Sequence, residues 1–547
     1  MGDSFRKALT EYFQSEKSDT RIIDEEVDTR FETTAISFLN GTSVSLFKRL
    51  KGYSHFNLIS NILGSEERIL FFSGSRTRAD FLRRWKKALS MDIDSSEMPA
   101  LSRAPFRERI LTGSDVDLNV LPVPEHFSND GSKLAKRKYI TSGLLITRNP
   151  ENKGILNMGY GRIQILGKSR FAFDCGSKGH TWSYIRKNMD NGEATDFSVV
   201  IGTHPIFYLL GAAFIEDEFH RAREFIDFDV AEGYMNGIPV PADAEIVIEA
   251  THNPGEIIEE GPFGEYTGYM GYDTTGFTAS CKSIMYRNNA IYYDILPSNS
   301  MEHVNNFSYP RSLLIESRIA ESLPGNSQLK IEWPHYASRF LALGYAESGA
   351  GSIAMQAACG IVAQDPLWAK FVLIYRKKSS LELQGFLAAI AASSEHAFSN
   401  ITILPESFII SSDVSSGGIM KSSRLLAQLD PCHYKVRKFR DHLIIDTGKH
   451  SCLISHGHSE GLDLEIYLPD DIDLEDFSKI GWAISTRVDP GRDISISGGR
   501  MVMDSRRAGA EIPVMNVEAL KNAERVVEAY SKNGKIMVKR QNFSPFS

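Results

Sequence analysis

The chain has 547 residues, of which 42% are hydrophobic and 24% charged, and its formal net charge is -8. So long a chain exceeds one compact core, which predicts a folded protein of roughly two to four domains. The sequence has no long basic run, which excludes the clustered Lys and Arg surface typical of nucleic-acid binding. Scattered cysteines, a polar N-terminus and short apolar runs predict a cytoplasmic protein with reduced thiols and no membrane span.

Residues 1–115 are predicted to form a mixed helix and strand region. Helical spacing predicts a helix over Arg78–Leu89, and the short apolar run Arg68–Phe72 is predicted as a strand. Two prolines predict an extended linker over residues 119–126.

Residues 116–320 have a β-rich pattern. Four strands are predicted there, over Tyr139–Thr147, Phe197–Ile201, Ala244–Ala250 and Ile284–Leu296, the last interrupted by an Asn-Asn turn. A mostly antiparallel sheet or a small barrel accommodates this run of strands.

Residues 321–547 alternate strands with helices, which is typical of an α/β domain. Strands are predicted at Lys370–Tyr375 and Leu443–Asp446, and helices at Leu381–Ala392 and Val517–Lys532. The predicted fold class is therefore a multi-domain α/β protein with a β-rich centre.

A glycine-rich stretch, Asn157–Arg162, lies inside the β-rich region, and Gly179 and His180 follow it. Glycine weakens a strand, but it is expected where a ligand must approach the backbone closely, because it has no side chain. An amide oxygen, an imidazole and a nearby carboxylate suit a divalent ion that also binds phosphate. On spacing alone, a loop with a hydrogen-bonded Asn and a surface His explains the same residues.

Two carboxylates, Glu260 and Glu265, flank the segment Gly261–Gly264. Its glycines and proline exclude a helix and predict a tight irregular loop. If Arg162 pairs with one carboxylate, the other is free to carry a proton, which is the arrangement of an acid/base pair. A solvated acidic turn is the alternative.

Two further groups of residues, an acidic run and a set of histidines, are weak evidence for a metal site when taken alone. The acidic run 216–220 contains Glu216 and Glu218 and is typical of a helix start. The histidines His450, His456 and His458 lack zinc-like spacing, which favours a loop.

Five motifs together resemble the UbiD decarboxylases, which include the polyprenyl-hydroxybenzoate and ferulic acid decarboxylases. The motifs occur in the family's order, at Asn157–Arg162, Gly179–His180, Pro241–Glu249, Glu260–Tyr269 and Trp482–Asp493. The similarity covers approximately residues 35–375 and 465–510. It implies a central split β-barrel that binds prenylated flavin mononucleotide (prenylated FMN), with α/β regions on either side.

The resemblance also implies a role for each matching residue. Catalysis is assigned to Arg162, Glu260 and Glu265, and a divalent metal, usually Mn²⁺ with K⁺ nearby, to Asn157, His180 and Glu218. Glu216 stays an alternative third ligand, because the loop before it is shorter than in relatives. Cofactor binding is assigned to Asn157, Gly159, Tyr160, Arg162, Gly179, His180 and Lys370, of which the lysine contacts the cofactor phosphate.

The implied reaction removes CO₂ from an α,β-unsaturated or (hetero)aromatic carboxylic acid, or adds it in the reverse direction. Arg162 would orient the carboxylate, Glu260 would hold Arg162, and Glu265 would protonate the carbon that loses CO₂. The implied partners are a flavin prenyltransferase that supplies the cofactor and further copies of the chain, in a dimer or hexamer. A non-catalytic flavin-binding or scaffold subunit is the alternative, and a flavin oxidoreductase ranks last because the chain has no dinucleotide fingerprint.

One departure from the family pattern concerns residues 376–465, which separate the Lys370 strand from an acidic segment that normally follows it closely. This insertion is expected to form an extra subdomain, a lid or an assembly surface. It also makes Lys449 a less favoured substitute for Lys370.

Overall fold

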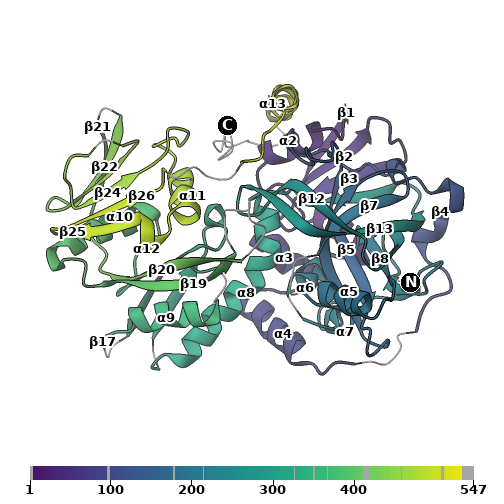
Figure 1. The fold of residues 1–547 in the computed structure, drawn as a ribbon, viewed down its shortest axis with the longest axis horizontal. Helices are drawn as coiled ribbons and strands as arrows, with labels where there is room; N and C mark the ends of the chain where they lie inside the picture. The colour runs from purple at the N-terminus through teal and green to yellow at the C-terminus, as the bar shows by residue number, and fades with distance from the viewer. Residues whose placement is uncertain are drawn as a thin grey trace. The chain divides into compact units, whose positions relative to one another are not determined.

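The structure is a computed structural model, and it describes residues 4–94, 99–175, 179–213, 215–325, 327–348, 351–365, 368–410, 419–439, 441–457, 459–506 and 511–532. The chain forms two compact units (Figure 1). The first comprises Met1–Tyr266, Met270–Pro310 and Ile512–Ser547, and the second comprises Thr267–Tyr269 and Arg311–Glu511. His458, one of the three clustered histidines, lies outside the described residues.

The first unit contains a four-stranded sheet in the order β1-β2-β3-β14. Its strands are β1 (Arg21–Val27), β2 (Ser45–Leu50), β3 (Phe56–Ser60) and β14 (Ala290–Asp294). The helices of this region are α1 (Ser4–Gln14), α2 (Glu32–Leu39), α3 (Glu66–Phe72) and α4 (Arg78–Ser90). β14 comes from far along the chain and pairs parallel with β3, so the sheet and the β-rich region share one core.

Helix α4 confirms the prediction for residues 78–89, but the strand predicted over Arg68–Phe72 is wrong. This run belongs to α3, whose N-terminus is capped by Ser65, which accepts a hydrogen bond from the backbone N–H of Arg68 at 3.4 Å. Glu66 and Glu67 in its first turn favour the positive end of the helix dipole. So short an apolar run has no period to separate helix from strand, and the capping residues decide the structure.

A closed six-stranded antiparallel barrel forms the centre of the first unit, which confirms the small barrel predicted from the sequence. Its strands run in the order β11-β8-β5-β6-β7-β13, and β11 pairs back with β13 to close the ring. Their bounds are β5 (Tyr139–Arg148), β6 (Leu156–Ile165), β7 (Arg170–Asp174), β8 (Thr195–Ile201), β11 (Ile246–His252) and β13 (Met270–Tyr286). Two further strands, β4 (Arg109–Thr112) and β12 (Ile257–Gly264), pair with β13 outside the ring.

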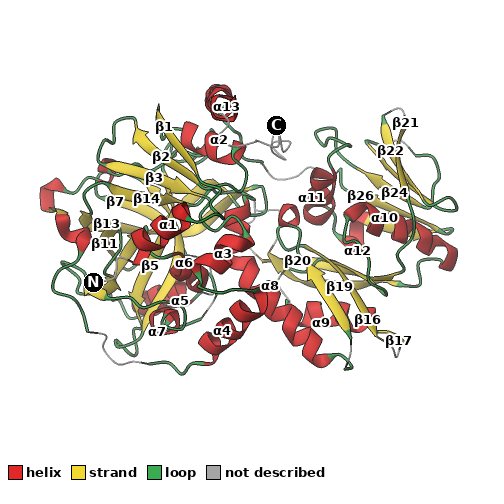
Figure 2. Cartoon of the chain, turned by 180° about the vertical axis from the view of Figure 1, so that it is seen from behind, coloured by secondary structure: helices red, strands yellow, loops and turns green. Residues whose placement is uncertain are grey.

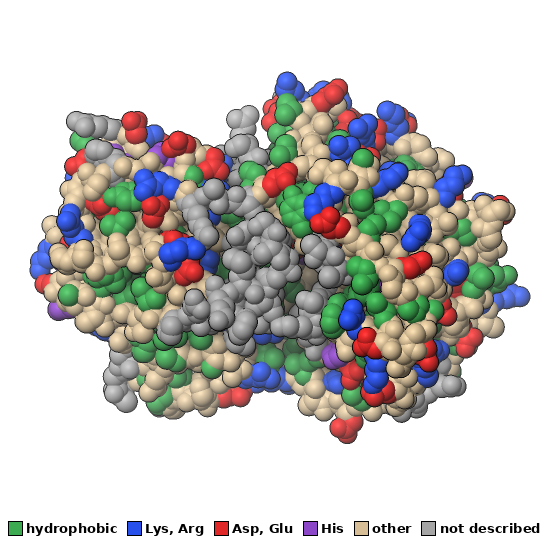
Figure 3. All heavy atoms as spheres, in the orientation of Figure 1, with side chains coloured by type: hydrophobic (Ala, Val, Ile, Leu, Met, Phe, Trp, Pro, Cys, Tyr) green, Lys and Arg blue, Asp and Glu red, His purple; other side chains and the backbone are tan. Residues whose placement is uncertain are grey.

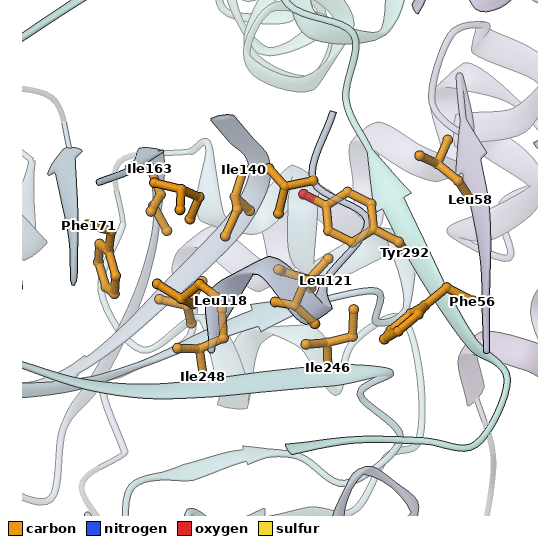
Figure 4. Packing of buried hydrophobic residues seen from close by; sticks show 14 of the residues in the cluster. Phe56, Leu58, Leu118, Leu121, Ile140, Ile163, Phe171, Ile246, Ile248 and Tyr292 are labelled. Carbon is orange, nitrogen blue, oxygen red and sulfur yellow. The ribbon is translucent and has the colours of Figure 1, made fainter. Parts of the chain in front are cut away.

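Apolar side chains fill the barrel, as expected for a ring of this size. Figure 4 shows Leu118 and Leu121, from the segment before β5, between Ile140 of β5 and Ile246 and Ile248 of β11. The same buried cluster continues through Tyr292 of β14 to Phe56 and Leu58 of β3 (Figure 4). The barrel and the four-stranded sheet are therefore packed as one body.

Short elements surround the barrel. They are α5 (His180–Asp190), α6 (Pro205–Gly211), α7 (Glu218–Ala222), the strand pair β9 (Val230–Glu232) and β10 (Pro239–Pro241), and the first part of α8 (Met301–Ser322). Near the end of the chain, α13 (Val517–Lys532) packs on α2, and Asn522 donates a hydrogen bond to Glu32 at 2.9 Å. The predicted C-terminal helix is confirmed.

The second unit contains two six-stranded sheets (Figure 2). One has the order β15-β16-β18-β20-β19 with β17 paired to β16, and it uses β15 (Gln328–Glu332), β16 (Leu341–Ser348), β17 (Gly351–Ser352), β18 (Phe371–Tyr375), β19 (Ile401–Ile410) and β20 (Ile419–Leu429). The other runs β21-β22-β23-β24-β26-β25, with β21 (Lys435–Phe439), β22 (His442–Asp446), β23 (Ser451–Ser455), β24 (Leu464–Tyr467), β25 (Ile494–Ser497) and β26 (Arg500–Asp504). The helices are α9 (Ala354–Gln364), α10 (Leu383–Ala392), α11 (Phe477–Arg487) and α12 (Pro490–Asp493).

Residues 376–465 are divided between these two sheets. They supply β19 and β20 to one sheet and β21, β22 and β23 to the other. β20 pairs parallel with β18, so the segment is built into the α/β layers of the second unit.

The surface agrees with the charge pattern of the sequence. Figure 3 shows Lys and Arg side chains interspersed with Asp and Glu over the visible face. Within the part of the chain that the structure describes, every helix is too short or too polar to cross a lipid bilayer.

Candidate active site

The first unit contains a cavity of about 290 Å³ beside β6 and the start of α5. Among its lining residues are eight predicted from the sequence: Asn157, Gly159, Tyr160, Arg162, Gly179, His180, Glu218 and Glu265. Glu260 is completely buried behind this wall, and Lys370 belongs to the second unit. Sequence reasoning missed other lining residues, among them Thr141, Asp174, Cys175, Thr181, His303 and Phe307.

Arg162, on β6, is the centre of a cluster of carboxylates. Its Nε donates to Glu260 Oε2 at 2.8 Å, and its Nη2 lies 2.6 Å from the same oxygen. Its Nη1 donates to Glu265 Oε1, so both glutamates contact one guanidinium. The prediction that only one of the two would pair with Arg162 is therefore wrong.

The two glutamates differ in burial. The Glu260 side chain is 0% exposed, whereas that of Glu265 is 21% exposed and faces the cavity. Burial raises the pKa of Glu260 from 4.5 to about 7, although Arg162 opposes that shift. Glu260 is therefore the buried partner of Arg162, and Glu265 is the partner that lines the cavity.

The segment that carries the glutamates is a bulged strand rather than the tight loop predicted. β12 pairs with β13, and its register shifts on both sides of Glu260. Across the pairing, Gly271 leaves space for Glu265, since a Cβ there would lie 2.7 Å from Glu265 Oε1. The glycines and the proline excluded a helix correctly, but pairing with a distant strand decides the final form.

Asn157, His180 and Glu218 come from three different elements and line the same cavity. The side-chain amide of Asn157 donates to Thr181 Oγ1 at 2.7 Å, which leaves its oxygen as the group able to bind a cation. His180 Nδ1 lies 3.0 Å from the carbonyl oxygen of Ile215, which can only accept a hydrogen bond, so Nδ1 is the donor. In the tautomer that donates from Nδ1, the lone pair is on Nε2, as in histidines that bind metals.

Glu218 is the carboxylate of this group. It accepts a hydrogen bond from the backbone N–H of Met158 at 2.8 Å, and burial raises the pKa of its carboxyl well above the usual value. The alternative residue, Glu216, is absent from the cavity lining and instead accepts hydrogen bonds from Tyr184 Oη and from Asn149 Nδ2. Within the described ranges, no group of three His, Cys, Asp or Glu side chains is placed to hold a metal. The set of Asn157, His180 and Glu218 differs from such groups because one of its three members is an amide.

The glycines of β6 have a structural cause that the sequence did not show. A Cβ on Gly159 would lie 2.8 Å from Thr181 Oγ1, and one on Gly161 would overlap the Leu145 side chain. These glycines allow close packing on α5 and β5. Close approach of a ligand is therefore not needed to explain them.

Part of the cavity wall comes from α8 and is partly polar. His303 Nδ1 donates to the Ser298 carbonyl oxygen at 2.8 Å, and burial lowers the pKa of His303 to about 4, so the ring is neutral. Phe307 packs edge-on against Tyr266 with ring centroids 4.9 Å apart. This wall combines an apolar surface with an uncharged imidazole.

Comparison with known proteins identifies the family. Residues 99–300 match the family model described as the 3-octaprenyl-4-hydroxybenzoate carboxy-lyase Rift-related domain, and residues 13–89 match the N-terminal domain of the same enzyme. The chain belongs to the UbiD family.

Among curated UbiD relatives, the anhydromevalonate phosphate decarboxylase of Methanosarcina mazei is 28% identical over 268 residues, which cover 48% of this chain and 59% of the relative. A protein of Synechocystis without an assigned function is 28% identical over 300 residues, which cover 50% of this chain and 58% of that protein. The matched region thus spans under two thirds of the length of these relatives.

Solved UbiD-class structures share the fold. HmfF from Pelotomaculum thermopropionicum, in complex with FMN, has a TM-score of 0.67 and 24% identity over 78% of this chain and 93% of its own. An evolved dimeric form of HmfF, in complex with prenylated FMN, has a TM-score of 0.60 and 21% identity over 92% of this chain and 95% of its own. The apo 3,4-dihydroxybenzoic acid decarboxylase of Enterobacter cloacae has a TM-score of 0.66 and 18% identity over 78% of this chain and 93% of its own.

Lys370 of this UbiD protein lies just before β18, in the second unit. It is 6% exposed, its Nζ donates to the carbonyl oxygen of Thr486 at 3.3 Å, and burial lowers its pKa to about 7. Contact with a cofactor phosphate stays a prediction. The substitute considered, Lys449, is exposed in the turn between β22 and β23.

Proposed function

We propose that this UbiD protein decarboxylates an α,β-unsaturated or (hetero)aromatic carboxylic acid, using prenylated FMN with Mn²⁺ and K⁺. The observation that carries the proposal is Arg162, a guanidinium on the cavity wall held from behind by the buried Glu260 and from the side by Glu265. Such a fork is suited to bind a substrate carboxylate through two parallel hydrogen bonds.

The residues of the cavity fit the proposed cofactor and metal. Asn157, His180 and Glu218 offer an amide oxygen, an imidazole nitrogen and a carboxylate, which suit Mn²⁺ bound to a phosphate. Burial raises the pKa of Glu218 well above its usual value in spite of the opposing charge of Arg221, so a divalent ion would favour its charged form. When bound, prenylated FMN supplies the electron sink that decarboxylation requires and that no amino-acid side chain provides.

The chain's own residues orient the substrate and move one proton. An incoming carboxylate competes with Glu265 for Arg162, because both use the same guanidinium. Displacement releases Glu265 within the cavity, where it can deliver a proton to the carbon atom that loses CO₂. Glu260 stays hydrogen-bonded to Arg162 and keeps the guanidinium in place.

The proposal is tested by co-expression with a flavin prenyltransferase and anaerobic purification. The absorption spectrum, the mass of the bound cofactor and the manganese content are recorded before a panel of acids is assayed. The panel contains cinnamate-like, hydroxybenzoate and heteroaromatic acids, together with an unsaturated aliphatic acid phosphate of the kind suggested by the name of the Methanosarcina relative. Bound prenylated FMN with about one manganese per chain and release of CO₂ from one acid would support the proposal.

Two variants separate catalysis from mere binding. Glu265→Gln is expected to keep the cofactor and abolish turnover, because the amide cannot donate a carboxyl proton. Glu259→Gln is the matched control, since the Glu259 side chain is 54% exposed and pairs with Lys133 outside the cavity. Full turnover by Glu265→Gln would refute the role of Glu265 as proton donor. A cofactor-loaded wild type that acts on no acid would favour the non-catalytic flavin-binding subunit.

A further inference from the structure

Arg162 is surrounded by more negative charge than it can neutralise. Glu260 and Glu265 contact it directly, and Asp174 Oδ2 lies 3.6 Å from its Nη2. Arg162 is the only Lys or Arg among the described residues that line the cavity. A substrate carboxylate at Arg162 adds a further negative charge to this set.

A second layer of acid and base groups lies behind Glu260. Asp130 is completely buried, and its Oδ2 accepts the backbone N–H of Phe127 at 3.0 Å. His126 is also completely buried, and its Nε2 lies 3.0 Å from Asp294 Oδ1. Asp294 Oδ1 accepts a further hydrogen bond from Thr141, which lines the cavity, at 3.0 Å.

Three buried atoms of this layer have no hydrogen-bond partner among the described residues. They are Glu260 Oε1, Asp130 Oδ1 and His126 Nδ1. Each belongs to a group that can gain or lose a proton, and each loses contact with bulk water. We call Glu260, Asp130 and His126 the proton-holding cluster.

Burial brings the pKa values of two of these groups, Glu260 and Asp130, close to neutral pH. Burial raises the pKa of Asp130 to about 7, with His126 opposing the shift and Glu260 adding to it. Asp294 and Asp130 raise the pKa of His126 against the effect of its burial. Tyr139 also faces Glu260, but burial raises the pKa of this phenol well above its usual value, so it stays neutral.

We infer that a substrate carboxylate binds at Arg162 together with a proton, which the proton-holding cluster takes up from solvent. The inference rests on the proposed function, because it requires Arg162 to bind the carboxylate. An added anion makes each nearby carboxylate harder to keep ionised, so the cluster binds a proton when the acid binds. The overall reaction converts a carboxylate and one proton into the product and CO₂, so this uptake supplies a proton that turnover consumes.

The pH dependence follows from linkage. Below about pH 6 the cluster is already protonated in the free protein, so binding of the acid takes up few further protons. Uptake is largest just above neutral pH, between the pKa values of the free and bound states, and it declines again at higher pH. The affinity for the acid therefore falls as the pH rises through this window.

The test measures protons directly and needs no turnover. The prenylated-FMN holoenzyme is titrated with 3-phenylpropionate, cyclohexanecarboxylate and tetrahydrofuran-2-carboxylate, saturated acids that resist decarboxylation, by calorimetry at pH 7.5. Each titration is made in Hepes and in Tris, whose ionisation enthalpies differ, and the difference in heat gives the number of protons exchanged. We expect uptake of about 0.5–1 proton per bound acid, and none for 3-phenylpropanamide, which has no charge.

Variants assign the uptake to the cluster. Asp130→Asn keeps an oxygen for the Phe127 N–H but cannot titrate, and it is expected to reduce uptake by at least about half. Glu249→Gln is the control, because Glu249 is a completely buried carboxyl of the same barrel that accepts hydrogen bonds from Met235, Asn236 and Ser283. Its proton number is expected to equal that of the wild type.

Three outcomes count against the reasoning. If an acid binds to the wild type without proton uptake, the inference is overturned and the proposed function stands. If folded Asp130→Asn takes up as many protons as the wild type, the cluster is wrongly assigned; if Asp130→Asn does not fold, the wild-type heats and their pH dependence still decide. If none of the three saturated acids binds, Arg162 is not a carboxylate site, and the proposed function falls with the inference.

Discussion

Replacing Glu260 by Gln is expected to stabilise the first unit at alkaline pH while it lowers turnover. Glu260 is completely buried, and its carboxyl must lose a proton inside the protein as the pH rises. Gln has nearly the same shape and represents the protonated form at every pH. The difference between the two proteins therefore isolates the cost of ionising this group.

The magnitude follows from the pKa of Glu260, which is 4.5 without the protein environment and about 7 in the folded state. A group whose pKa is raised on folding contributes its full stability below the unfolded value and loses it as the pH rises through the folded value. A shift of 2.5 units, at 1.36 kcal/mol per unit, corresponds to about 3 kcal/mol. The free energy of unfolding of Glu260→Gln, relative to the wild type, should therefore rise by about 3 kcal/mol between pH 4.5 and pH 8.

Urea unfolding at pH 4.5, 6, 7 and 8 measures this difference, with a fluorescence or circular dichroism signal that follows the first unit. Glu259→Gln is the control, since the Glu259 side chain is exposed. Its free energy of unfolding should change with pH in parallel with that of the wild type. A difference between Glu260→Gln and wild type that stays constant with pH would refute the reasoning. So would a variant that is less stable than the wild type at pH 8.

Three further predictions concern the site and the fold. Arg162→Lys keeps the positive charge but loses the paired N–H donors of the guanidinium, so kcat/KM in a steady-state assay should fall by about 10²-fold or more. An unchanged kcat/KM would count against carboxylate binding at Arg162. His180→Ala should lower bound manganese at least about tenfold by elemental analysis, whereas His456→Ala in the second unit should not; equal loss in both would contradict the assigned ligand. Gly131→Ala would make a Cβ overlap a backbone carbonyl oxygen and should lower Tm far more than Gly113→Ala, which has a similar positive φ (58° and 56°) and open space; similar Tm values would disprove the clash.

Local patterns predicted β5, β8 and β11 of the barrel because each of these strands carries its own signal. Tyr139–Thr147 and Phe197–Ile201 combine β-branched and aromatic residues with clear ends, and both are strands of the closed ring. Ala290–Asp294 shows where this fails. It is a strand, as predicted, but it pairs with β3 in another sheet, and only the tertiary structure decides that partner.

The candidate site could be predicted only in part. Residues of the glycine-rich strand and the two glutamates were found because each stands inside a short motif. Asp130 was missed, because the sequence Asn-Asp-Gly is typical of a surface turn and nothing local shows that the turn is completely buried. Asp174 was missed as well, because its relevance comes from the pairing of β7 with β6, which brings it to Arg162.

The buried acids also help to decide between two hypotheses, a catalyst and a non-catalytic flavin-binding or scaffold subunit. A carboxylate held in the interior costs stability, and replacing a buried charged group by a well-packed apolar one is often neutral or stabilising. A protein that only carried a flavin would need neither Glu260 nor Asp130 behind Arg162, and it would be more stable without their ionisation at neutral pH. Groups that change protonation near pH 7 are instead what proton transfer at neutral pH requires. The charge arrangement around Arg162 therefore favours a catalyst over a scaffold, and the pH-dependent stability of Glu260→Gln measures the basis of that argument.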